Sequence, residues 1–458
     1  MSKKGYDSVP VKQGEEIEAE VVDLAYGGEG VAKYNNFTIF IPFAIPGDKL
    51  TVVVDEVKKN YARASIKKVV NDSPLFTIPI CGHFRKCGGC QWINMKYAGQ
   101  LKYKMKILET TLKKTGGLEK VKIGKPVLHP EPFYYRERAQ YKLAAGSEKI
   151  SLGFYRAKSH EVIDVETCYI VKEKINEIIR HTREFLNSHK KEVTVYDERT
   201  GKGYIRHISV KVNSDNEALV TFVIAKNDVR EYLRKYARFI RNKTEGIKGV
   251  TVNINTEKTN RVFSDKDTAL EGSMHITERI GGINFRIGPA TFFQVNSAML
   301  KKMTEFTGKH IKSGEKVIDL YGGAGALSVP FYKKASEITV VDISRKSTED
   351  LDEIIRENEI DNVIAVNESA EKAAGRLIQE KNPDTLVLDP PRKGVHPAII
   401  REILKNKVRN IIYISCNPVT FARDIKELGG KYEIKEVVPV DLFPHTYHIE
   451  VMSHLRLK

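Results

Sequence analysis

Several features that define common protein classes are scarce or missing in this chain of 458 residues. Its five cysteines are too few, and odd in number, to form a disulfide scaffold. No apolar run approaches the ~18 residues that a membrane span needs, which predicts a protein without a membrane segment. The N-terminus is polar and lacks the apolar core of a signal peptide, so we expect a cytoplasmic protein. In that reducing compartment, cysteines more often bind metal or act as nucleophiles.

The composition is that of a folded, basic protein. Apolar residues make up 41% and charged residues 29% of the chain. At ~100–200 residues per domain, the length predicts about two to four domains, and we expect a monomer. The formal net charge of +16 favours a polyanionic partner, nucleic acid first. A ribosome-associated or simply soluble basic protein is the alternative.

The positive charge is concentrated in residues 84–142. This stretch contains 14 lysines and arginines against four glutamates, interleaved with tyrosine and phenylalanine. Cations neutralise phosphates and aromatic rings stack on unpaired bases, so we expect RNA to dock here. A solvated helix face over residues 95–114 is the alternative.

Residues 12–68 consist of short alternating or apolar runs separated by glycine- and proline-containing turns. Four or five short strands in about 60 residues predict a small β-barrel. Residues 1–72 carry 10 basic against 11 acidic side chains, so aromatic and loop contacts would have to contribute to any RNA binding there. A purely structural barrel is the alternative.

The remainder of the chain predicts an α/β architecture. A helix is expected over about residues 93–115, and residues 125–285 mix strands and helices. From Gln294 onward, strands alternate with helices, which predicts a parallel sheet with right-handed crossovers. The strands are expected at 317–320, 338–342, 385–389 and 411–415, followed by two final strands at about 433–440 and 447–455.

A glycine-rich loop follows the first of these parallel strands. Gly322, Gly323 and Gly325 stand between that strand and an expected helix, and the next strand ends in Asp342. Glycines let the backbone approach a ligand closely, and an acid at this position bonds a ribose hydroxyl in Rossmann-like units. The spacing departs from that of NAD sites and fits S-adenosylmethionine better. A plain turn is the alternative.

Four of the five cysteines can supply thiolates to one metal centre. Cys81, Cys87 and Cys90 lie close together, and Cys168 lies far along the chain. Thiolates suit zinc or iron–sulfur clusters, and a division of three plus one favours a 4Fe–4S cluster. Buried cysteines without a ligand are the alternative.

The fifth cysteine, Cys416, ends an apolar strand directly before an expected helix that starts at Asn417. A helix N-terminus favours the thiolate, so we expect a reactive thiol rather than a core residue. Asp389 ends another strand and is followed by two prolines. This rigid Asp-Pro-Pro turn is expected to hold the carboxylate over the reactive group of a cofactor, or else to be a turn that binds no ligand. Similar motifs in amino-group methyltransferases are usually followed by an aromatic residue, and Arg392 at that position counts against methylation of an amino group. Glu450 lies on an expected apolar strand. A carboxylate buried there would carry a desolvation cost that a role as general base would explain, and a glutamate facing the surface is the alternative.

These motifs together resemble the RNA uracil-C5 methyltransferases over nearly the whole chain. The resemblance rests on CGHFRKCGGCQW, GPATFFQVN, DLYGGAGALSV, LVLDPPRKGV, YISCNPVTFARDI and VDLFPHTYHIEV. It implies an OB-like TRAM domain at 9–69 and an α+β iron–sulfur domain at 70–285, with the helix at about 93–115 packing on the catalytic domain. A Rossmann-like class I methyltransferase domain is implied at 286–458.

The resemblance also implies roles for individual residues. Cys416 would add to carbon 6 of uracil, and Glu450 would remove the proton from carbon 5 after methyl transfer from S-adenosylmethionine. The implied 4Fe–4S ligands are the four cysteines named above. The residues implied to line the cofactor site are Gln294, Tyr321, Gly323, Asp342 and Asp389.

The resemblance favours 23S ribosomal RNA as the substrate, with the T-loop of transfer RNA as the alternative. A non-catalytic RNA-binding or redox-sensing iron–sulfur protein is a further alternative, from a different functional class.

Overall fold

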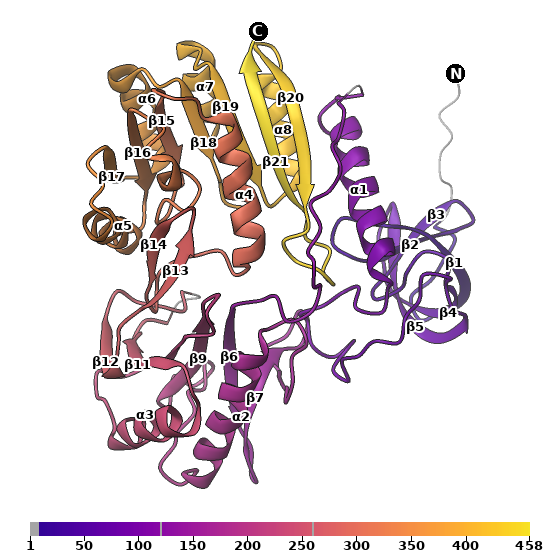
Figure 1. The fold of residues 1–458 in the computed structure, drawn as a ribbon. Helices are drawn as coiled ribbons and strands as arrows, with labels where there is room; N and C mark the ends of the chain where they lie inside the picture. Colours follow the sequence, from indigo (N-terminus) through magenta and orange to yellow (C-terminus); the bar gives the residue numbers. More distant parts are fainter. Residues whose placement is uncertain (1–8, 120, 259–260) are drawn as a thin grey trace, which may run out of the picture.

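The computed structural model describes residues 9–119, 121–258 and 261–458, and it arranges them around three main β-sheets (Figure 1). The polar N-terminal segment used to predict a protein without a signal peptide lies outside these residues. Within them, no helix combines the length and the apolar character needed to cross a membrane.

The N-terminal sheet closes into a barrel with the strand order β1-β2-β3-β5-β4. Alternate side chains of β1, among them Ile17, Ala19 and Val21, point into the barrel core. This alternation is the sequence pattern that predicted the barrel, and the prediction is confirmed. The strands are β1 Glu16–Leu24, β2 Gly30–Tyr34, β3 Phe37–Ile41, β4 Lys49–Val57 and β5 Tyr61–Asn71.

The central sheet has seven strands in the order β12-β11-β10-β9-β6-β7-β8, and only β10 and β11 pair in parallel. Its strands are β6 Arg138–Ala145, β7 Ile150–Tyr155, β8 Val162–Asp164, β9 Ile205–Val212, β10 Ala218–Ile224, β11 Ile247–Ile254 and β12 Asp267–Gly272. Two helices, α2 Glu173–Ser188 and α3 Glu231–Lys243, pack against this sheet. Strands β9 and β10 are buried along their whole length, because they lie in the middle of the sheet.

The C-terminal sheet has the order β17-β16-β15-β18-β19-β21-β20, and its first five strands are parallel. Its strands are β15 Lys316–Leu320, β16 Glu337–Asp342, β17 Val363–Asn367, β18 Thr385–Leu388, β19 Asn410–Ser415, β20 Tyr432–Val440 and β21 Glu450–Leu457. The accompanying helices are α4 Ser297–His310, α5 Arg345–Glu357, α6 Ala370–Lys381, α7 Pro397–Asn406 and α8 Pro418–Leu428. The predicted Rossmann-like fold is confirmed. The strand order reverses direction between β15 and β18, which is where open α/β sheets bind their ligands.

One predicted element is wrong: the glycine-rich loop does not lead into an α-helix. Only a 3₁₀ turn, Val329–Phe331, forms there. Pro330 has no N–H to donate to the carbonyl of Ala326, four residues earlier. That carbonyl instead accepts a hydrogen bond from the Thr304 hydroxyl of α4, at 3.1 Å. The loop is therefore held by a neighbouring helix and not by a helix of its own.

A hairpin between the two large sheets crosses the expected boundary at residue 285/286. Its strands are β13 Ile276–Ile280 and β14 Ile283–Ile287. The hairpin side chains share a hydrophobic core with α4 and the C-terminal sheet. The hairpin's apolar side chains are thus buried mainly against the C-terminal elements, with Leu219 of β10 in the same core.

Helix α1, Tyr97–Lys114, lies between the barrel and the C-terminal strands (Figure 1) and contacts both α8 and β1. The Lys104 ammonium donates to Asp441 at 2.6 Å and to the carbonyl of Phe443 at 3.0 Å. The Tyr97 hydroxyl donates to the other oxygen of Asp441 at 2.7 Å. Burial lowers the pKa of Lys104, and Asp441 opposes that shift. Lys104 was counted among the cations expected to dock RNA, but it is buried within the protein.

Replacing Lys104 by alanine is expected to destabilise the fold by about 3–5 kcal/mol, because Asp441 would remain buried without its cationic partner. Chemical denaturation followed by circular dichroism measures the loss. The control is Lys102→Ala, which removes an exposed lysine from the same helix. Equal stability of the two variants would contradict the assigned role of the ion pair.

Candidate active site

The carboxyl ends of the parallel strands gather four of the predicted site residues at one edge of the sheet. Tyr321 follows β15, Asp342 ends β16, Asp389 follows β18 and Cys416 follows β19. Neighbouring parallel strands end on the same side, so residues far apart in sequence become neighbours. The order of strands, which the sequence does not reveal, makes β15 and β18 adjacent.

The glycine-rich loop is fixed by Asp342. One oxygen of this carboxylate accepts from the backbone N–H of Gly323 at 3.0 Å, and the other accepts from Ser344 at 2.7 Å. Gly323 has φ +57°, and a Cβ there would meet nothing within 4 Å. A Cβ on Gly322 would lie 2.5 Å from Val340. The two glycines therefore do different work, since Gly322 allows close packing and Gly323 leaves the loop open to a ligand.

A buried carboxyl group beneath this loop was missed by the sequence reading. Asp319 on β15 is fully buried, and one of its oxygens accepts from the Ser328 hydroxyl at 2.6 Å. Its other oxygen has no hydrogen-bond partner among the described residues. Burial raises the pKa of Asp319 to about 7, and Asp389 and Asp342 add to the rise. The sequence did offer a signal for this buried acid, because Asp319 is the one acidic residue within the strand sequence KVIDL.

Cys416 lies two residues before α8, and the Asn417 side chain caps that helix by accepting from the Val419 N–H at 3.0 Å. The expected stabilisation of the thiolate by the helix start does not dominate here. Burial raises the pKa of the Cys416 thiol to about 12, with further contributions from Glu450 and Asp389. The effect of the helix start is thus outweighed by desolvation and two nearby carboxyl groups.

Glu450 is the first residue of β21 and is buried beside Asp389. Burial raises the pKa of Glu450 well above its usual range, and Asp389 raises it further. Burial likewise raises the pKa of Asp389. Two carboxyl groups that influence each other in a buried site favour the retention of protons. Glu450 can therefore act as a base only after it has lost its proton.

Arg392 is the cation that opposes these shifts. It lowers the pKa values of both Cys416 and Glu450, although burial and the carboxyl groups dominate. Its backbone carbonyl accepts from the Asn417 amide at 2.9 Å, and its guanidinium lies 3.2 Å from the His448 ring. In the sequence Arg392 served only as an argument against amine methylation, whereas the structure places it near Cys416 and Glu450.

The barrel also reaches this site, which the sequence did not indicate. Tyr26 follows β1, and its ring lies edge-on to Tyr447, with the centroids 5.9 Å apart. Burial raises the pKa of Tyr26 to about 12; Arg392 opposes this rise, whereas Cys416 and Glu450 add to it. Tyr26 of the barrel therefore lies near Arg392, Cys416 and Glu450.

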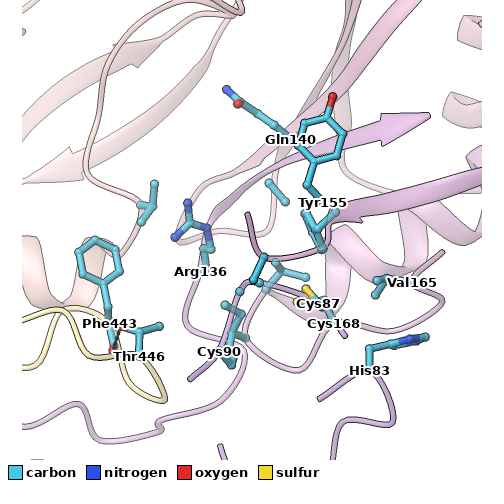
Figure 2. Close-up of a pocket in the computed structure, with 18 of the residues that line it drawn as sticks. His83, Cys87, Cys90, Arg136, Gln140, Tyr155, Val165, Cys168, Phe443 and Thr446 are labelled. Atoms are coloured by element: carbon cyan, nitrogen blue, oxygen red, sulfur yellow. Dashed lines mark hydrogen bonds between the residues drawn. The ribbon is translucent and has the colours of Figure 1, made fainter. Parts of the chain in front are cut away.

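A cavity of about 880 Å³ adjoins the site and is lined by all four remaining cysteines (Figure 2). Gln294 and Arg392 line it too, whereas the other predicted cofactor residues, Cys416 and Glu450 are not among its lining residues. Gln294 belongs to a loop that Lys211 anchors by donating to the carbonyls of Gly288 and Thr291. The cavity thus connects the cysteines to the active site through Arg392.

The four cysteines are free thiols that influence one another. Burial raises the pKa of Cys168 to about 11 and that of Cys90 well above its usual range, and neighbouring cysteines add to both shifts. Over the described ranges, no three histidine, cysteine or acidic side chains are gathered as a metal-ion site. Cys81, Cys87, Cys90 and Cys168 nevertheless all line the same cavity, and no carboxylate lines it.

Comparison with known proteins gives the family. The model of the tRNA (uracil-5-)-methyltransferase family matches residues 96–458, and the TRAM domain model matches residues 10–67. The chain therefore belongs to this family of S-adenosylmethionine-dependent RNA methyltransferases and carries an N-terminal TRAM domain.

Relatives of similar length support this assignment. An uncharacterized RNA methyltransferase of Fusobacterium nucleatum is 34% identical over 98% of this chain and 97% of that protein. One of Halalkalibacterium halodurans is 33% identical over the full length of both. The crystal structure of Pyrococcus abyssi tRNA (uracil-54, C5)-methyltransferase with S-adenosyl-L-homocysteine is 25% identical. It superposes with a TM-score of 0.75, covering 96% of this chain and 100% of that one.

Arg392→Met is expected to slow the alkylation of Cys416 by iodoacetamide about threefold at about pH 9. Loss of the guanidinium raises the pKa of the thiol further, so that less thiolate is present. Mass spectrometry of the Cys416 peptide measures the rate. Arg401→Met, an exposed change on α7, is the control. Alkylation at or above the wild-type rate would show that Arg392 does not favour the thiolate.

Proposed function

We propose that this protein methylates carbon 5 of a uridine in RNA through a covalent Cys416–uracil adduct. The observation that carries the proposal is the grouping of Cys416, Glu450, Asp389 and Arg392 at the strand ends beside the glycine-rich loop. Methylation of an amino group needs no nucleophile, whereas an unactivated pyrimidine carbon does.

The reaction balances with the side chains present. The Cys416 thiolate forms a bond to carbon 6 of uracil, and the electron pair of the 5,6 double bond makes carbon 5 nucleophilic. S-adenosylmethionine supplies the methyl group that carbon 5 attacks. Glu450 then takes the proton from carbon 5, the 5,6 double bond re-forms, and the thiolate leaves. Arg392 favours the ionised forms of both Cys416 and Glu450 during these steps.

The cofactor contacts follow from the loop geometry. Asp342 retains free lone pairs for ribose hydroxyls although both of its oxygens accept backbone N–H groups. Gly323 offers an open approach along the backbone. Tyr321 and Asp389 lie at the ends of adjacent strands, and we assign them to contacts with the methionine part of the cofactor. Gln294 lines the large cavity, and we assign it to a cofactor contact from that side.

We assign 23S ribosomal RNA as the first candidate substrate, on the resemblance of the barrel and cysteine arrangement to enzymes of that type. Transfer RNA is the second candidate. The observation that favours it is the similarity over 96% of this chain, which includes the barrel, to a Pyrococcus abyssi enzyme for tRNA uracil-54. A target uridine in a folded loop of either RNA is easily unstacked.

We also propose that the chain holds a 4Fe–4S cluster through Cys81, Cys87, Cys90 and Cys168. All four line one cavity, and their thiols are close enough to shift each other's pKa. The cluster is assigned a structural role, because the cysteine loop lies beside the cavity that faces the active site. It would tie the segment ahead of α1 to the central domain.

Cys416→Ala is expected to abolish 5-methyluridine formation while S-adenosylmethionine still binds, because the cofactor contacts are left intact. Transcripts of 23S rRNA and of tRNA are assayed in parallel by nucleoside mass spectrometry. Glu450→Gln is expected to accumulate the RNA–protein adduct on denaturing gels, since the proton on carbon 5 is retained. The control is Val419→Ala, an exposed change on α8. Methylation by Cys416→Ala would refute the covalent route.

Protein purified without oxygen is expected to contain about four iron and four sulfide ions per chain. Cys168→Ala should lose most of both, because one thiolate ligand is gone. Cys416→Ala is the matched control and should keep the wild-type iron content, since Cys416 does not line the cavity. Zinc in place of iron and sulfide would contradict the cluster.

A further inference from the structure

A second pocket, of about 260 Å³, lies in the central domain and has no part in the proposed reaction. Strands β6 and β9 and the segments flanking the central sheet supply its walls. Its lining residues are mostly basic or aromatic: Lys142, Tyr155, His160, Tyr196, Glu198, Arg206, His207, Lys258, Arg261 and Val262.

The pocket carries an excess of positive charge. Lysine and arginine contribute four cations, of which Arg261 is paired with Asp265, and Glu198 is the one carboxylate among the lining residues. Glu198 is already engaged, because it accepts from the Tyr155 hydroxyl at 3.3 Å and lies 3.3 Å from a ring nitrogen of His160. Like charges held together in a concave wall favour the binding of an anion.

Arg206 is built into the floor of this pocket. Its side chain is only 7% exposed, and one terminal nitrogen donates to the carbonyls of Asn255 and Glu257. Its guanidinium lies over the Tyr196 ring, 4.9 Å from the centroid. The Nε atom is buried and makes no hydrogen bond to any described residue. The Arg206 Nε–H group is therefore an unpaired donor that could bind an acceptor atom of a ligand.

Lys142, one of these four cations, faces His207 on the neighbouring strand. The Lys142 ammonium lies 3.1 Å from a ring nitrogen of His207, which is buried. Burial lowers the pKa of His207 to about 3, and Lys142 and Arg206 lower it further, so a neutral His207 can accept from Lys142. Burial also lowers the pKa of Lys142. A bound anion would stabilise this partly desolvated cation.

The pocket continues from the large cavity. Tyr155 and His160 line both. In Figure 2 the Tyr155 ring points away from the cysteines, and its hydroxyl bonds to Glu198 of the smaller pocket. An extended strand that leaves the cavity past Tyr155 therefore meets the basic pocket next.

We propose that this pocket binds one nucleotide of the RNA substrate, at a position outside the target uridine. Lys142 and Lys258 contact the phosphate, Arg206 donates to an acceptor of the nucleotide, and the base stacks on Tyr196. The volume suits a single nucleotide and excludes a duplex. This inference rests on the proposed function, because it takes RNA as the substrate.

The test is the binding of a fluorescein-labelled 20-nucleotide oligouridylate, followed by fluorescence anisotropy at several salt concentrations. Lys142→Ala and Lys258→Ala should each weaken binding about three- to tenfold and lessen the salt slope by ~0.7. Lys235→Ala, which removes an exposed lysine from α3, is the matched control and should leave both unchanged. Melting temperatures verify that the variants are folded.

Two outcomes would overturn the proposal. In the first, both pocket variants bind the oligouridylate like Lys235→Ala. In the second, they lose affinity for uridine monophosphate or inorganic phosphate but keep their affinity for RNA, which would make the pocket a site for a free phosphate compound. Wild-type methylation of RNA is measured alongside. Pocket-dependent binding without methyl transfer would refute the proposed function alone, and methyl transfer without pocket dependence would refute this proposal alone.

Discussion

The buried ion pair between Lys104 and Asp441 is the constraint that fixes α1 between the barrel and the C-terminal sheet. It holds α1 against the segment that leads into β21, and β21 begins with Glu450. Just ahead of α1, Trp92 donates through its ring to Gly28 of the barrel and through its backbone to His445. A buried pair contributes stability only in a well-defined geometry, so this one fixes the barrel and the catalytic segment relative to each other.

Burial also determines the protonation behaviour of the residues at the candidate active site. Asp319 and Glu450 are buried and Asp389 is half-buried at one edge of the C-terminal sheet, and Arg392 opposes the rise in the pKa of Glu450. The same desolvation raises the pKa of the Cys416 thiol, and Arg392 opposes that rise.

Local patterns in the sequence were enough to predict the barrel, the parallel strands and the residues at their ends, because each depends on neighbours in the chain. The 3₁₀ turn was not predicted, since the Thr304 contact that replaces a helical bond comes from another helix. The same reason explains why Tyr26 was missed. The pairing of Lys104 with Asp441 joins positions 337 residues apart, and no pattern in either segment reveals it.

The protonated carboxyl groups have a thermodynamic consequence for cofactor binding. S-adenosylmethionine carries a positive sulfonium, and a cation placed near Asp389 or Asp319 lowers the pKa of each carboxyl group. Binding is then coupled to the release of protons, so that affinity for the cationic donor rises with pH in the range where these groups titrate. The product S-adenosylhomocysteine lacks the sulfonium charge, so its affinity is expected to depend less on pH than that of the donor.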